Sequence, residues 1–117
     1  MLSDSLVLIP TYNEKENIEK IIRTVFSLPD DFHILIIDDG SPDGTATIVK
    51  TLFAKYTGQL FLEERFGKMG LGTAYIHGFR WSMERGYMYI FEMDADFSHS
   101  PADLLKILKE RFSPIQL

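Results

Sequence analysis

Apolar runs of strand length alternate with helix-like patterns along the chain. Four such runs occur, and they cover residues 5–9, 33–37, 59–62 and 87–93. The second run is apolar at every position from Ile34 to Ile37, which is typical of a strand covered on both faces. Strand–helix alternation of this kind predicts right-handed crossovers and parallel strands. The predicted fold class is therefore α/β, a Rossmann-like parallel sheet with helices on both faces, built from about four β-α units.

Residues that favour helix N-termini precede the helical patterns. Asn13, with Glu16 three residues later, matches a capping box before the apolar positions that begin at Ile18. Ser41 followed by Pro42 suits the cap and the first residue of a second helix. Two further helices are predicted, from near Gly72 to Gly86 and from Ser100 onward.

Length, composition and charge restrict the class of protein. The chain has 117 residues, of which 45% are hydrophobic and 25% charged, as in ordinary globular domains. The absence of cysteine excludes disulfide frameworks, thiolate zinc sites and cysteine nucleophiles. A net charge of −5 with scattered basic residues argues against nucleic acid as a partner. No apolar run has the length of a membrane span and no signal-peptide pattern is present, so we predict a soluble, cytoplasmic domain.

Two carboxylates follow the last apolar run. Asp94 and Asp96 are one residue apart, and oxygen ligands on a short turn suit Mg²⁺ or Mn²⁺. Ligands of open parallel sheets bind beyond the carboxyl ends of the strands, which is where this pair would lie. The alternative, in which Asp96 only caps a turn before the next helix, remains open.

Polar residues also follow the first two runs. A carboxylate of the segment Asp38-Asp39-Gly40 could accept hydrogen bonds from the ring N–H groups of a nucleobase, or Asp39 and Ser41 could bond local backbone amides. Tyr12 and Glu14 could stack on a base and hydrogen-bond to it, although Glu14 could equally be a first-turn acid that favours the helix dipole.

A glycine-rich segment, residues 67–72, precedes the third predicted helix. Such a segment could cradle phosphate, or its glycines could simply allow close packing. Arg65 and Lys68 add positive charge that an anionic ligand could use.

Four strings in order along the chain resemble a known enzyme family. They are VLIPTYNE at 7–14, DDGSPDGT at 38–45, GLGTAY at 70–75 and MDADFSH at 93–99. They resemble family-2 glycosyltransferases of the GT-A fold, and most closely the dolichol- or polyprenol-phosphate mannosyltransferases. This resemblance extends over residues 6–108.

The resemblance implies an inverting enzyme that transfers mannose from GDP-mannose to a dolichyl or polyprenyl phosphate. Asp94 and Asp96 would be the catalytic Asp-x-Asp pair that holds Mg²⁺ or Mn²⁺ against the diphosphate, with Ala95 contacting the nucleotide sugar through its backbone. The acceptor phosphate is already an oxyanion at neutral pH, so no catalytic base is nominated. The implied guanosine pocket consists of Pro10, Tyr12, Glu14, Ile37 and Asp39.

Family domains are longer than this chain. We therefore predict one nucleotide-sugar-binding domain over residues 1–117 that lacks the C-terminal part of the family domain. The lipid acceptor implies peripheral contact with the cytoplasmic face of a membrane, and an exposed sheet edge would favour a homo-oligomer.

Two alternatives from other classes are weighed against this enzyme. One is a truncated module that binds a nucleotide sugar without catalysis. The other is a phosphotransferase similar to the haloacid dehalogenases, with Asp94 as nucleophile and Asp96 as acid/base. In that family the acidic pair follows the first strand, whereas here it follows the fourth apolar run.

Overall fold

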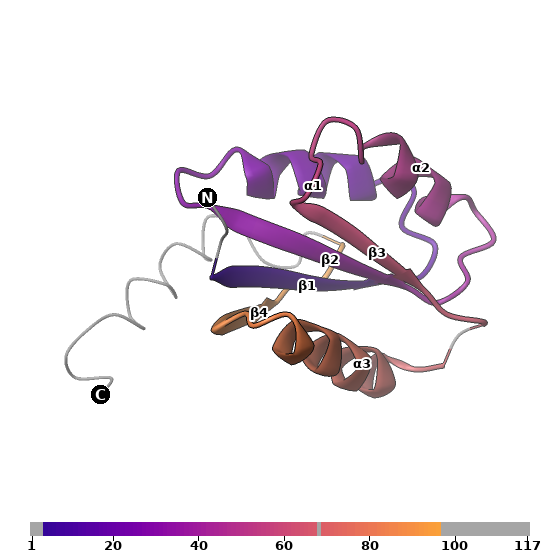
Figure 1. Cartoon of the computed structure of the whole chain (residues 1–117). Coiled ribbons are helices and arrows are strands. Elements are labelled where there is room, and N and C mark those ends of the chain that lie inside the picture. Colours follow the sequence, from indigo (N-terminus) through magenta and orange to yellow (C-terminus); the bar gives the residue numbers. More distant parts are fainter. Residues whose placement is uncertain (1–3, 68, 97–117) are drawn as a thin grey trace.

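The computed structural model describes residues 4–67 and 69–96. Within them lies one sheet of four parallel strands in the order β3-β2-β1-β4, with helices on both faces (Figure 1). The strands are β1 (Ser5–Thr11), β2 (Phe32–Asp38), β3 (Leu60–Glu64) and β4 (Tyr89–Glu92). The helices are α1 (Ile18–Phe26), α2 (Thr45–Thr51) and α3 (Leu71–Glu84). The predicted α/β parallel architecture is confirmed.

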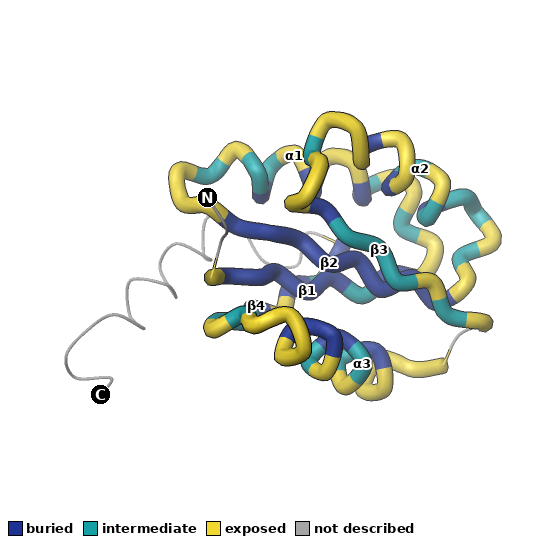
Figure 2. Tube along the Cα trace, viewed as in Figure 1, coloured by how far each residue is buried: buried dark blue, intermediate teal, exposed yellow. Residues whose placement is uncertain are grey.

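The two central strands are apolar because both of their faces are covered (Figure 2). Alternate side chains of β1 and β2, such as Val7 and Ile34, pack in the core formed with α1 and α2. The intervening side chains, such as Leu8 and Leu35, pack with α3 on the opposite face. Removing these runs from water on both sides is the main stabilisation of the sheet.

Close packing of α3 on β1 depends on a glycine. Gly78 is buried, and a Cβ atom at this position would overlap the Leu8 side chain and lie 3.0 Å from Cδ1 of Ile37. The helix therefore rests directly on the central strands. The end of α3 agrees with the predicted stop at Gly86, which has a left-handed backbone (φ 80°) and donates to the Met83 carbonyl (3.1 Å), while the Tyr87 N–H donates to the Ser82 carbonyl (3.2 Å). The following strand, β4, starts at Tyr89 rather than at residue 87.

The first helix begins later than predicted. Its N-cap is Asn17, not Asn13, and α1 starts at Ile18. Asn13 has a left-handed backbone (φ 56°), which is incompatible with a helix start at that residue. Glu14 therefore precedes α1 rather than lying in its first turn, and its carbonyl accepts hydrogen bonds from the Asn17 and Ile18 N–H groups.

The second helix also begins later than predicted. It starts at Thr45 after Gly44, because Ser41 is engaged with Asp38 rather than with a helix N-terminus. The helix predicted from Ser100 lies outside the described residues. Among the described helices, none is long and apolar enough to span a bilayer.

Candidate functional site

A small cavity opens at the carboxyl end of the central strands. Its volume is about 110 Å³, and it lies between the end of β1 and the start of α3. Three residues of the predicted guanosine pocket, Pro10, Tyr12 and Asp39, line it. The other lining residues are Thr11, Gly70, Leu71 and Ala74.

The remaining predicted pocket residues are not among those that line this cavity. Ile37 is fully buried in the core, with Leu8 and Ala74 in the same cluster. Glu14 is half-buried in the loop after β1. Side-chain contact between Ile37 and a ligand in this cavity is therefore not supported by the geometry.

The loop after β1 is held by side chains of the loop after β2. Three backbone N–H groups of the first loop donate to the second: Asn13 to Ser41 Oγ (2.8 Å), Glu14 to Thr45 Oγ1 (3.0 Å) and Lys15 to Asp43 Oδ2 (3.1 Å). These bonds give the SPDGT string a structural role, because its hydroxyl and carboxylate oxygens are the acceptors. They hold the segment next to Tyr12 in place.

A buried carboxylate, Asp38, anchors both loops. Thr11 Oγ1 donates to its Oδ1 (2.7 Å), and Ser41 donates through its N–H (3.0 Å) and through its hydroxyl (2.6 Å). Sequence reasoning did not single out Asp38. The signal was available, since parallel pairing places Thr11 opposite Asp38 in the register of β1 and β2.

Asp39 forms a buried ion pair with Arg65. The two side chains are each 8% exposed, and both Nε and Nη2 of Arg65 lie 2.6 Å from Asp39 Oδ1. The Met69 N–H donates to the other oxygen, Oδ2 (3.2 Å). Arg65 also donates to Thr73 Oγ1 (3.1 Å) and to the Gly70 carbonyl (3.2 Å). Arg65 is thus engaged within the protein, and it ties the loop before α3 to the end of β2.

The turn after β2 requires glycine because two loops meet there. Gly40 has a φ of 69°, and a Cβ atom on it would lie 2.8 Å from the Gly67 nitrogen. Gly58 has a similar φ of 76°, but a Cβ there would meet nothing within 4 Å. Comparing alanine substitutions at Gly40 and Gly58 therefore separates the cost of a left-handed backbone from the cost of steric overlap.

We expect Gly40→Ala to destabilise the chain more than Gly58→Ala. The left-handed backbone alone costs about 1–2 kcal/mol for a non-glycine residue. Overlap at Gly40 adds about 1–3 kcal/mol. Urea unfolding of both variants measures the difference, and equal losses of unfolding free energy would show that the approach of the two loops is unimportant.

The acidic string after β4 lies at the same edge of the sheet. Asp94 is half-buried, Ala95 is buried and Asp96 is exposed. Tyr75 of α3, which sequence reasoning did not assign a role of its own, donates to Asp94 Oδ1 across 3.4 Å. Burial raises the pKa of Tyr75 to about 12, and the Asp94 charge adds to the rise. The tyrosine therefore stays protonated and can orient Asp94.

Carboxylates of the loops after β2 and β4 act on Glu14, which lies in the loop after β1. Burial raises the pKa of Glu14, a hydrogen bond with Asn17 opposes the rise, and the charges of Asp96, Asp43 and Asp94 increase it. A cation near Asp94 and Asp96 would offset this repulsion, and their oxygens are the donors that Mg²⁺ and Mn²⁺ prefer. Within residues 4–67 and 69–96, no three acidic or histidine side chains are grouped closely enough to hold a metal on their own. Substrate phosphate and water would have to complete the shell.

The fold and the position of this site define the chain as a GT-A-type α/β domain, and comparison with known proteins gives its family. The family model described as glycosyl transferase family 2 matches residues 6–111, and the chain belongs to this family. The resemblance noted in the four strings is thereby confirmed.

Two curated relatives are similar over most of this chain. It is 45% identical over 104 residues to polyprenol monophosphomannose synthase of Mycolicibacterium smegmatis, covering 89% of this chain and 39% of the relative. It is 42% identical over 104 residues to undecaprenyl-phosphate mannosyltransferase of Micrococcus luteus, covering 89% and 42%. The chain thus spans about two-fifths of the length of these relatives.

Solved structures share the fold. A mannosyltransferase from Pyrobaculum calidifontis, in complex with GDP-Man and Mn²⁺, superposes with a TM-score of 0.76 at 24% identity, covering 95% of this chain and 33% of that one. TarS residues 1–349 of S. aureus superpose with a TM-score of 0.66 at 19% identity, covering 92% and 32%. At these identities the likeness concerns the fold alone.

Proposed function

We propose that the chain is the nucleotide-sugar-binding part of an inverting glycosyltransferase that transfers mannose from GDP-mannose to a polyprenyl or dolichyl phosphate. One observation carries this proposal. The cavity lined by Pro10, Tyr12 and Asp39 lies at the same edge of the sheet as Asp94. The names of the two relatives, a polyprenol monophosphomannose synthase and an undecaprenyl-phosphate mannosyltransferase, support the choice of sugar and acceptor.

The cavity would take the guanine base. Tyr12 is 38% exposed at its wall and offers a ring face for stacking. Asp39 Oδ1 is occupied by Arg65, but Oδ2 accepts only the Met69 N–H among the bonds found in the described residues. A carboxylate oxygen has two lone pairs, so Oδ2 can accept one more hydrogen bond, from a ring N–H of the base.

The diphosphate and sugar would lie toward β4. Asp94 and Asp96 would hold Mg²⁺ or Mn²⁺, which would offset the charge that develops on the GDP leaving group. Tyr75 would hold the Asp94 carboxylate in one orientation. In the transfer, an oxygen of the lipid phosphate forms a bond to the anomeric carbon of mannose, and the bond from that carbon to GDP breaks. The acceptor oxygen is already ionised, so no side chain has to remove a proton.

A thermal melt of the 117-residue chain with GDP, UDP, ADP or GDP-mannose, with and without Mn²⁺, tests the binding part of the proposal. A ligand at a hundredfold excess over its dissociation constant stabilises the folded state by about 2.7 kcal/mol. We expect stabilisation by GDP and GDP-mannose that requires Mn²⁺ and exceeds that by UDP or ADP. Equal stabilisation by UDP would contradict guanine selectivity, and a cooperative melt unaffected by every nucleotide would contradict nucleotide binding.

A binding module without catalysis is the second candidate, since the chain spans about two-fifths of its relatives. Transfer of radiolabelled mannose from GDP-mannose to polyprenyl phosphate distinguishes the two. Guanine-selective binding without any transfer by the chain would support the module, and measurable transfer would support the enzyme.

A further inference from the structure

The edge strand β3 has backbone groups that point out of the sheet. Among the described strands it pairs only with β2 (Figure 1). The Gln59 carbonyl accepts from β2 (2.9 Å), and the Arg65 N–H donates to the Asp38 carbonyl (2.8 Å), so the odd-numbered residues of this segment bond to β2. Alternate residues of a strand bond to the same side, which leaves the intervening residues directed outward. The outward residues are Leu60, Leu62 and Glu64.

Leu62, at the centre of β3, has an uncommitted backbone. Its N–H and C=O form no hydrogen bond within the described residues, whereas the outward N–H of Leu60 already donates to the Tyr56 carbonyl (3.1 Å). The strand contains no proline and no lysine, which are common means of preventing an edge from pairing. A free edge of this kind is a template for another strand.

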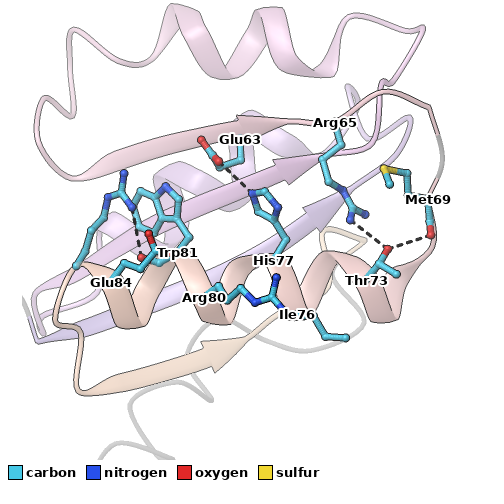
Figure 3. A pocket seen from close by; sticks show the side chains of 10 residues that line it. Glu63, Arg65, Met69, Thr73, Ile76, His77, Arg80, Trp81 and Glu84 are labelled. Carbon is cyan, nitrogen blue, oxygen red and sulfur yellow. Dashed lines mark hydrogen bonds and ion pairs between the residues drawn. The ribbon is translucent and has the colours of Figure 1, made fainter.

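The space beside β3 is open because α3 packs on the central strands. Gly78 of α3 approaches Leu8 of β1 and Ile37 of β2, and a groove of about 550 Å³ remains between α3 and β3 (Figure 3). A second hollow, of about 500 Å³, includes Phe61 and Leu62 of β3. Every residue of β2 is buried, but these two are only half-buried. The edge of β3 is therefore not covered by the described part of the chain.

An antiparallel partner strand centred on Leu62 makes the best use of the free groups. In that register Leu62 of one copy would exchange both hydrogen bonds with Leu62 of the other, and the Glu64 N–H would donate to the Leu60 carbonyl. Directly opposite residues lie on the same face, so Phe61 would lie against Glu63 of the other copy. Centring the pair on Glu63 would instead set two glutamates opposite each other.

Charges on the α3 side of β3 are complementary in this register. The centres of the Phe61 and Trp81 rings are 5.1 Å apart, and the Arg85 guanidinium lies 3.8 Å from the centre of the Trp81 ring. Arg85 is exposed and forms no ion pair within the described residues. Glu63 contacts His77 through Oε1 (3.0 Å), as Figure 3 shows, which leaves Oε2 available. Glu63 of the other copy, opposite Phe61, would come next to Arg85, and the two-fold axis would repeat this contact.

We propose that two copies of the chain associate through β3 as an antiparallel pair, which joins their sheets into one. The partner is a second copy because this edge supplies both halves of the contact, the free backbone groups of Leu62 and the opposite charges of Glu63 and Arg85. The strands of the two copies would point in opposite directions, so the two candidate sites would lie at opposite ends of the dimer. This pairing does not depend on the proposed function.

Sedimentation equilibrium of the 117-residue chain over a range of concentrations tests the association. We expect a monomer–dimer equilibrium that Glu63→Lys and Arg85→Glu each weaken at least about tenfold, because each substitution brings like charges together. The variant that carries both substitutions restores opposite charges and should recover most of the lost association. Glu16→Lys is the matched control, since Glu16 is also exposed but lines a separate hollow beside α1.

Amide hydrogen exchange identifies the strand that pairs. In the dimer, the Leu62 N–H should exchange at least about tenfold more slowly than in the dilute monomer. The Phe61 N–H points to β2 in both states, so its exchange should change little. A difference between these neighbouring residues distinguishes pairing of the strand edges from a contact made by side chains alone.

Several results would overturn the pairing of β3 edges. These are a monomer at every concentration, equal weakening of the dimer by Glu16→Lys, and a dimer in which the Leu62 N–H exchanges as fast as in the monomer. A dimer that Glu63→Lys and Arg85→Glu both leave unchanged would also contradict it. Failure of the double variant to recover association would overturn the proposed register.

Discussion

Replacement of Arg65 by alanine is expected to lower the free energy of unfolding by about 3–5 kcal/mol. Arg65 and Asp39 are each 8% exposed, so the substitution would leave a buried carboxylate without its counter-ion. It would also remove the hydrogen bonds to Thr73 and Gly70 that attach the loop before α3. Urea denaturation measures the loss, which should appear as a lower midpoint.

An exposed ion pair in the same chain provides the control. Arg23 and Glu19 lie 2.8 Å apart on α1, with side chains 42% and 51% exposed. Water screens such a pair, so Arg23→Ala should lower the free energy of unfolding far less than Arg65→Ala does. The double variant Arg65→Ala with Asp39→Ala should lose less than the sum of the two single losses, because it leaves no unpaired charge. Similar losses for Arg65→Ala and Arg23→Ala would contradict the importance of burial.

The sheet could be predicted from the sequence because the hydrophobic pattern of its strands determines their environment. An uninterrupted apolar run such as residues 34–37 is buried on both faces only between two covering layers. Alternation of such runs with helical patterns then predicts parallel strands. The carboxyl edge followed from the same topology. The expectation that Pro10, Tyr12 and Asp39 share one pocket came from the resemblance to the family, and all three residues line the cavity at this edge.

The starts of the first two helices could not be predicted, because tertiary contacts hold the residues that were expected to cap them. The Ser41 hydroxyl accepts the Asn13 N–H from 28 residues away and donates to Asp38. A local pattern contains the cap residue but not the competing tertiary partner. As a result, α1 begins at Ile18 rather than directly after Asn13, and α2 begins at Thr45 rather than directly after Ser41.

The side-chain pairs of the site could not be predicted from local sequence patterns either, because the two members of each pair are far apart in the sequence. Asp39 and Arg65 are 26 residues apart, and Tyr75 and Asp94 are 19 apart. The first pair follows from register, since β2 and β3 align Asp38 with Glu64 and thereby bring the next residues of both strands together. The second pair depends on how α3 packs under β1, which Gly78 permits and periodicity does not specify.

Replacement of Asp94 by asparagine is expected to weaken Mn²⁺-dependent binding of GDP-mannose about a hundredfold, or about 2.7 kcal/mol. Asparagine keeps the size of the side chain and an oxygen that can accept from Tyr75, but it removes the charge that would face the metal. With GDP-mannose at a hundred times the dissociation constant of the unaltered chain, stabilisation by the ligand should fall from about 2.7 to about 0.4 kcal/mol. Thermal melts with and without Mn²⁺ measure this change, which should be confined to the samples that contain Mn²⁺.

Asp30→Asn is the matched control for this substitution. It makes the same chemical change at an exposed position just before β2, at the opposite end of the sheet from Asp94. The control should keep the full Mn²⁺-dependent stabilisation, because Asp30 is remote from the carboxyl edge. If Asp94→Asn also kept it, the carboxylate would not be a metal ligand, and the divalent ion would have to bind through the nucleotide phosphates and other groups. The comparison of Asp94→Asn with Asp30→Asn therefore tests the role of Asp94. The identity of the nucleotide is tested separately, by comparing stabilisation by GDP with stabilisation by UDP.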